Sequence, residues 1–194
     1  MRQRISWALI LAVLVISVVA GEASWAETLP ASRGESDAAR ALDFSFEDIN
    51  PRSATHGQRL TLSELYPQRG LVLNFMASWC GFCWKELPEL QRLHAADAAK
   101  IVGVAADEGD ETGQVRALRK LLEQSEATIP VLYVPTKELA RIESFYDYSI
   151  LPATYLIDGQ GIVQHVFQGK VPEETLRREI RDRLGRRGET APPG

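Results

Sequence analysis

The chain has 194 residues, of which 45% are hydrophobic and 25% are charged. This balance is typical of one globular domain with flanking segments, and it excludes a disordered chain, a collagen-like chain and a polytopic membrane protein. The formal net charge of −4 offers no basic field for phosphates, so we expect no nucleic-acid partner. Cys80 and Cys83 are the only cysteines of the sequence, which excludes a disulfide-dense scaffold.

The N-terminal segment 1–26 has the order of a secretory signal peptide. Arg2 and Arg4 precede an uncharged, mostly apolar run over 5–20, and Ser24-Trp25-Ala26 offers small residues where a signal peptidase reads them. The run is shorter than the roughly 20 residues that span a bilayer, and an uncleaved membrane anchor remains the alternative. Both interpretations place the rest of the chain outside the cytoplasm, so we predict a periplasmic location.

The remaining chain divides into a spacer, one domain and a tail. Residues 27–41 are small and polar with no apolar period, which predicts a flexible linker. The Gly- and Pro-rich segment 185–194 is expected to be a frayed, flexible tail. One domain therefore fills roughly 42–184.

Short strand-like runs alternate with amphipathic stretches along this domain. Apolar runs and apolar–polar alternation predict strands over 44–49, 71–76, 101–106, 131–134, 154–157 and 162–167. Apolar residues at helical spacing predict helices over 86–98, 115–125 and 139–146, and a last helix that Pro172 opens. Asp158-Gly159 predicts a hairpin turn between the last two strands. This order predicts an α/β fold with a mixed sheet covered by helices.

The two cysteines directly follow a predicted buried strand, in Trp79-Cys80-Gly81-Phe82-Cys83, and open a helix. Cysteines at i and i+3 on a first helical turn can close a small disulfide ring. Unpaired backbone N–H groups and the positive end of the helix dipole favour a thiolate there, and the thiolate is the species that attacks a disulfide. Cys80, at the helix tip, is therefore the expected nucleophile, and Cys83 is the expected resolving thiol.

Other interpretations of the pair remain open at this point. A zinc site needs more ligands than one cysteine pair, and His56, His94 and His165 are scattered singly. A purely structural disulfide that closes so short a ring removes little loop entropy. A copper site that combines the pair with His165 is a further alternative. We expect no metal.

The segment LVLNFMASWCGFCWKELPEL, residues 71–90, resembles the exported TlpA/ResA-like branch of the thioredoxin-like superfamily. Glu86 and Pro88 follow the cysteines as in that family, and Leu151-Pro152 matches its proline loop. Asn74 stands where a cytosolic thioredoxin carries a buried aspartate. The resemblance covers roughly 42–184 and implies a thioredoxin-like fold, in which a central mixed sheet is flanked by helices. It also implies a cis Pro152 that faces the cysteines, preceded by an extra helix–strand insertion near 111–134.

The resemblance also implies an activity, namely a periplasmic thiol–disulfide oxidoreductase that reduces protein disulfides through a mixed disulfide. Cys80 and Cys83 would form the redox-active disulfide, and Trp79, Leu151 and Pro152 would bind the substrate. No cofactor is needed beyond the dithiol. The dipeptide Gly81-Phe82 departs from the more common x-Pro, which leaves the reduction potential open.

Glu86 is the third expected catalytic residue. It lies at i+3 from Cys83 on the same helix face, where a partly buried carboxylate would have a raised pKa and could exchange a proton with the thiol. A solvated helix glutamate is the alternative that this spacing leaves open, and the family resemblance favours the active role.

The same resemblance implies the partners. An exported reductant needs a membrane thiol donor, and typical targets are apocytochrome c or a copper-site assembly protein. We expect a monomer. The alternatives are a dithiol oxidase or isomerase that uses the same residues, and a copper-binding thiol chaperone.

Overall fold

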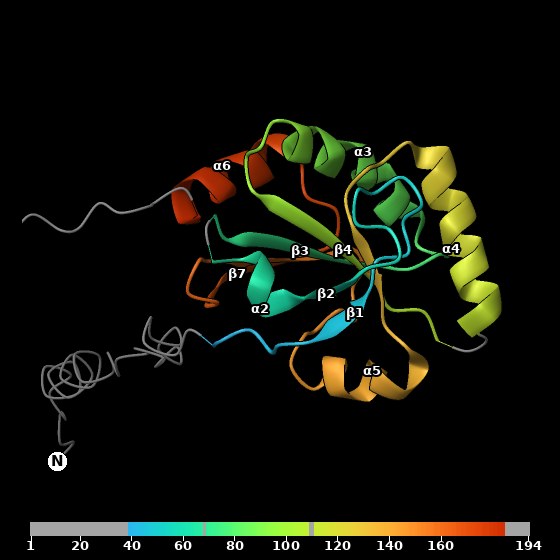
Figure 1. The fold of residues 1–194 in the computed structure, drawn as a ribbon. Coiled ribbons are helices and arrows are strands. Elements are labelled where there is room, and N and C mark those ends of the chain that lie inside the picture. Colours follow the sequence, from blue (N-terminus) through green and yellow to red (C-terminus); the bar gives the residue numbers. More distant parts are fainter. Residues whose placement is uncertain (1–38, 68, 109–110, 185–194) are drawn as a thin grey trace, which may run out of the picture. The chain divides into compact units, whose positions relative to one another are not determined.

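Figure 1 shows the fold in a computed structural model of the chain, which describes residues 39–67, 69–108 and 111–184. The expected signal peptide, most of the expected linker and the expected tail lie outside these residues. The elements are β1 (Ser45–Glu47), β2 (Arg59–Thr61), α2 (Leu62–Leu65), β3 (Leu71–Met76), α3 (Gly81–Ala95), β4 (Lys100–Ala105), α4 (Glu111–Ser125), β5 (Val131–Tyr133), α5 (Thr136–Glu143), β6 (Ala153–Ile157), β7 (Val163–Gln168) and α6 (Glu173–Arg183). In the described part of the chain, no helix combines the length and the apolar character needed to cross a membrane.

The central sheet has five strands in the order β5-β4-β3-β6-β7. Strand β3 pairs in parallel with β4 and antiparallel with β6, which confirms the mixed sheet. Every residue of β3 is buried, and this explains why its sequence is apolar on both faces apart from Asn74. Because β3 and β4 end where β6 begins, the segments after β3, after β4 and before β6 meet at one edge of the sheet.

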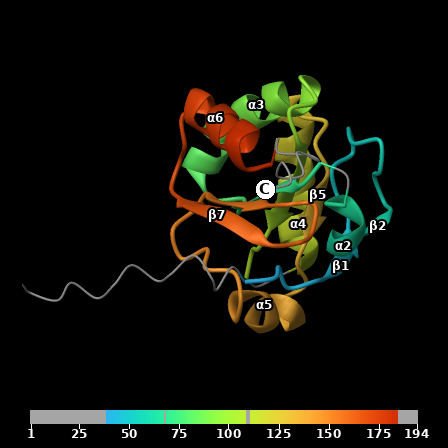
Figure 2. The ribbon, with the colours of Figure 1, turned by 90° about the vertical axis from the view of Figure 1, so that its left-hand side faces the viewer.

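Helices cover both faces of this sheet. Helices α3, α4 and α6 cover one face and α2 and α5 the other (Figures 1 and 2). Side chains of β3 alternate between the two layers, so that Val72 and Met76 meet α3 while Leu73 and Phe75 meet the α5 side. On the α5 side an aromatic cluster forms around Tyr146, whose ring centroid lies 5.1 Å from that of Phe75.

Several predicted elements differ at their ends. The strand expected over 44–49 is shorter and pairs with β2, which together with α2 was not predicted. The helix expected to reach residue 146 ends at Glu143, although Tyr146 is buried as its apolar spacing suggested. The helix expected to reach residue 98 ends at Ala95, and Asp97 just beyond it has a positive φ of 50°.

The predicted hairpin between β6 and β7 is confirmed, but its loop is longer than Asp158-Gly159 suggested. The Asp158 carboxylate accepts hydrogen bonds from the amides of Gln160 and Ile162, both at 2.9 Å, and Gly161 carries the positive φ. Residues 39–41, which we expected to be flexible linker, run beside this hairpin, where the amide of Ala41 donates to the carbonyl of Gly161 at 2.8 Å. The packed domain therefore begins before residue 42.

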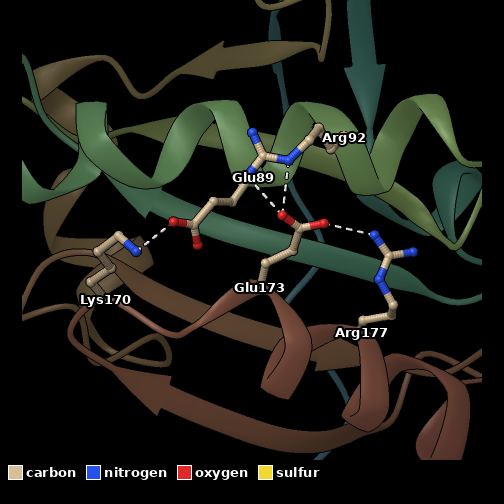
Figure 3. A network of polar contacts seen from close by, with 5 residues as sticks. All are labelled: Glu89, Arg92, Lys170, Glu173 and Arg177. Carbon is tan, nitrogen blue, oxygen red and sulfur yellow. Dashed lines mark hydrogen bonds and ion pairs between the residues drawn. The ribbon is translucent and has the colours of Figure 1, made fainter.

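A network of ion pairs joins α3 to α6 (Figure 3). Arg92 of α3 and Arg177 of α6 both bind the carboxylate of Glu173, each at 2.7 Å. Lys170, just before α6, lies 2.6 Å from the carboxylate of Glu89 on α3. The network holds the segment after β7 against the helix that carries the cysteines.

Candidate active site

Cys80 and Cys83 form a disulfide at the start of α3, with sulfurs 2.04 Å apart. Cys80 is the N-cap residue, and its Sγ accepts the amide of Cys83 at 3.2 Å. Both cysteines are nearly buried, at 6% and 2% exposure, whereas their neighbours Trp79 and Phe82 are 73% and 62% exposed. The pair therefore lies just beneath a surface framed by two exposed aromatic rings.

A buried aspartate holds the loop between β3 and this pair. Asp107, which follows β4, accepts the amide of Ser78 at 3.0 Å and also the Ser78 hydroxyl. The carbonyl of Ser78 in turn accepts the indole N–H of Trp84 at 3.0 Å. These bonds fix the backbone that presents Trp79 and Cys80. Asp107 was not predicted from the sequence, although its position at the end of a strand parallel to β3 is a signal that could have indicated it.

Glu86 is buried, with 1% exposure. Its Oε1 accepts the amide of Val171 at 2.9 Å, and its Oε2 accepts Nδ2 of Asn74 at 3.0 Å. Asn74 Nδ2 also donates to the hydroxyl of Thr154 at 2.9 Å. Burial raises the pKa of Glu86, while the hydrogen bonds from Val171 and Asn74 and the charge of Lys170 oppose that rise. The alternative of a solvated helix glutamate is therefore wrong.

The proline loop enters β6 at the same edge of the sheet. The Leu151–Pro152 peptide bond is cis, as the resemblance implied, and the carbonyl of Pro152 accepts the amide of Gly169 at 2.8 Å. Pro152 is buried, whereas Leu151 is half-buried. Leu151 and Trp79 line one groove of about 520 Å³, so the proline loop and the cysteine loop border a shared surface.

His165, the histidine considered for a copper site, lies on β7 and packs against a neighbouring ring. Its ring centroid is 4.4 Å from that of Phe167. Burial lowers the pKa of His165, and the charge of Arg183 lowers it further.

This strand order, with a disulfide at the tip of α3 and a cis-proline at the start of β6, defines a thioredoxin-like fold of the thiol–disulfide oxidoreductase class. The AhpC/TSA family model matches residues 38–166, and the chain belongs to that family. The thiol-disulfide oxidoreductases ResA of Oceanobacillus iheyensis and Bacillus subtilis are each 28% identical to it. The first match covers 73% of this chain and 70% of that protein, and the second covers 73% and 72%.

A solved structure of a thioredoxin-family thiol:disulfide interchange protein from Chlorobium tepidum has the same fold. It superimposes with a TM-score of 0.63 at 23% identity, over 78% of this chain and 100% of that one. The family and its named relatives make this chain an oxidoreductase of the same class.

Proposed function

We propose that this oxidoreductase acts in the periplasm and uses Cys80 and Cys83 to reduce disulfides of other proteins. The observation that carries the proposal is the cysteine pair at the start of α3, where the Cys83 amide donates to Sγ of Cys80. That amide and the helix dipole stabilise negative charge on Cys80, so a thiolate forms there more easily than on a free cysteine. Cys80 is thus the nucleophile and Cys83 the resolving thiol.

The reaction begins with the reduced enzyme. The Cys80 thiolate attacks one sulfur of the substrate disulfide, whose S–S bond breaks, and the second substrate sulfur leaves and takes up a proton. Cys83 then loses its proton and attacks Cys80, which releases the first substrate sulfur as a thiol. Two electrons pass from the enzyme dithiol to the substrate disulfide, and the enzyme is left with the Cys80–Cys83 disulfide.

Glu86 serves the second step in this proposal. Burial raises its pKa toward that of a thiol, so moving a proton from Cys83 to the carboxylate costs less than it would for a solvated glutamate. A negative carboxylate on the same helix face would also disfavour a second negative charge on Cys83.

Trp79, Leu151 and Pro152 contact the substrate in the same proposal. Trp79 exposes 73% of its surface beside Cys80. Leu151 precedes a proline that has no N–H of its own, so the Leu151 backbone is free to pair with an extended substrate segment by β-addition. The substrate disulfide would lie between the two loops.

Residues 1–26 act as the export signal in this proposal, with cleavage after Ala26, and 27–41 as a spacer whose last residues join the domain. An exported reductant has no soluble electron source, so a membrane thiol donor regenerates the dithiol. Mass spectrometry of the native protein tests the export step. A mature start at Glu27 in the periplasmic fraction supports it, an intact Met1 in membranes indicates an anchor, and recovery from the cytosol contradicts export.

The chemistry is tested by trapping. Cys83→Ala should accumulate mixed disulfides on Cys80, which captures the physiological target, with apocytochrome c and a copper-site assembly protein as the expected classes. Cys80→Ala should neither form adducts nor reduce insulin. The Cys80→Ala/Cys83→Ala double variant is the control for proteins that are captured without a bond to either cysteine. Insulin reduction by Cys80→Ala at the wild-type rate would contradict the assignment.

The direction of electron flow is tested by the reduction potential. A value near that of thioredoxin, about −270 mV, supports a reductase. A value near that of DsbA, about −120 mV, would instead support the oxidase alternative, with the same two cysteines working in reverse.

A further inference from the structure

The groove that Trp79 and Leu151 line has walls from three separate parts of the chain. Trp79 comes from the cysteine loop, Glu108 from the segment after β4, and Tyr148 and Leu151 from the segment between α5 and β6. Its volume of about 520 Å³ is sufficient for a long side chain. Two of its lining residues adjoin the site in the chain, because Trp79 directly precedes Cys80 and Leu151 directly precedes the cis-proline.

Three carboxylates, those of Glu108, Glu143 and Asp147, line this groove and are exposed. In the described part of the chain, no lysine, arginine or histidine lies within the 4.0 Å of an ion pair to any of them. Their polar side-chain partners are neutral. Glu143 accepts the hydroxyl of Tyr148 at 3.2 Å, and Asp147 accepts the side chain of Gln168 at 2.8 Å. Among the described residues, these three carboxylates therefore make no ion pair.

Two pKa shifts agree with this geometry. Burial raises the pKa of Tyr148, and the neighbouring charges of Glu143 and Glu108 raise it further. Hydrogen bonds from Ser149 and Gln168 lower the pKa of Asp147, so that this carboxylate is ionised at neutral pH.

The helix that carries the cysteines presents a charge of the other sign. There Lys85 lies over the ring of Phe82, with its Nζ 5.4 Å from the ring centroid. The surroundings of the cysteines therefore include a cation on α3 and carboxylates in the groove. This asymmetry favours one orientation of a charged substrate segment.

We propose that the groove binds a lysine or arginine side chain of the substrate protein, close in sequence to the cysteine that Cys80 attacks. The aliphatic stem would pack against Trp79, Tyr148 and Leu151, and the charged head would reach Glu143 and Asp147. Both aromatic walls also attract a cation. The proposal rests on the proposed function and adds to it a substrate class, namely disulfides flanked by a basic residue.

A groove lined by Trp79 and Leu151 can contact a residue a few positions from the target cysteine. An extended segment rises about 3.3 Å per residue, so a side chain two or three positions away lies roughly 7–10 Å along the chain. Substrate segments that run over Trp79 toward Leu151 would thus place such a residue in the groove.

Three cyclic disulfide peptides test the proposal. They are identical except for lysine, norleucine or glutamate two positions from the cysteine. Pre-reduced full-length enzyme is mixed with each peptide in a single turnover, and tryptophan fluorescence gives the second-order rate constant. We expect the lysine peptide to react about fivefold faster than the norleucine peptide, the upper range for one partly exposed ion pair. The glutamate peptide should be slowest, and added salt should reduce all the differences.

Variants locate the effect. The Glu143→Gln/Asp147→Asn double variant, which leaves only Glu108 of the three groove carboxylates, should lower the lysine-to-norleucine ratio by about twofold or more. Glu64→Gln/Glu123→Gln, which removes two exposed charges outside the groove, is the matched control and should keep the ratio. Equal lysine and norleucine rates in the wild type, or an undiminished preference in the groove variant, would overturn the proposal while the reductase function stands. If the wild type reduces none of the three peptides, the proposed function is overturned instead.

Discussion

Replacing Asn74 with alanine is expected to destabilise the oxidised domain by about 2–4.5 kcal/mol at pH 7. Asn74 is 2% exposed, and its Nδ2 donates to Glu86 and to Thr154. A hydrogen bond to a charged group contributes about 1.5–3 kcal/mol and a neutral one about 0.5–1.5, which gives this sum. At roughly 2–4 °C per kcal/mol for a domain of this size, the melting temperature should fall by about 4–18 °C.

The loss should depend on pH. Asn74 lowers the pKa of Glu86 by stabilising its carboxylate, so the variant raises that pKa further. Below both pKa values Glu86 is protonated in the wild type and the variant, and the difference in unfolding free energy is smallest. This difference in unfolding free energy grows as the pH rises and the wild-type carboxylate ionises. The total increase is about 1.4 kcal/mol for each pKa unit that separates Glu86 in the wild type from Glu86 in the variant.

Urea unfolding at pH 4 and pH 8 measures both effects. Thr154→Val, which removes only the neutral bond, is the matched control, with an expected loss of about 1 kcal/mol that does not change with pH. The reasoning would be refuted if Asn74→Ala cost less than about 0.5 kcal/mol at pH 7, below the value of a single neutral hydrogen bond. A loss that is the same at both pH values would refute the link to Glu86.

Three further predictions concern stability and turnover. Glu86→Gln should keep the fold but reduce turnover about tenfold or more. Because the folded-state pKa of Glu86 lies above its ordinary 4.5, the wild type should lose stability as the pH rises through that pKa. The variant should lack this loss in urea titrations. Leu90→Ala in the core should cost about 2–5 kcal/mol by the same measurement. Gly161→Ala should lower the free energy of unfolding by about 1–3 kcal/mol, because residue 161 has a positive φ and the new Cβ would lie only 2.6 Å from the Tyr66 ring. Calorimetry should show that a second change, Tyr66→Ala, removes the steric part of this loss.

The central strand could be predicted to the residue because its environment is uniform. Leu71–Met76 is buried on both faces, so apolar side chains occupy nearly every position. By contrast, β2 has only three residues, two of them half-buried, and too little pattern to distinguish it from a loop. Tyr146 was assigned to a helix because it continued an apolar spacing, yet it reaches the core from the segment after α5.

The polar surroundings of Glu86 could not be predicted from local spacing. The i+3 spacing placed it on one helix face with Cys83, but whether that face points inward depends on the amide of Val171, which lies 85 residues away. The other contact, with Asn74, involves a residue that the sequence analysis treated only as a marker of the family branch. The acidic groove was missed for the same reason, since Glu108 and Glu143 belong to segments that meet only in the folded chain.

The segment 169–171 constrains how the chain can vary in length. The amide of Gly169 bonds the carbonyl of Pro152, and two residues later the amide of Val171 bonds Glu86. An inserted residue would move one of these amides by about 3.8 Å, more than the length of a hydrogen bond. Surface connections usually tolerate insertions and deletions, but here a change of one residue would detach either the proline loop or the buried carboxylate. Relatives that keep both contacts are therefore expected to keep this two-residue spacing, whatever side chains they carry there.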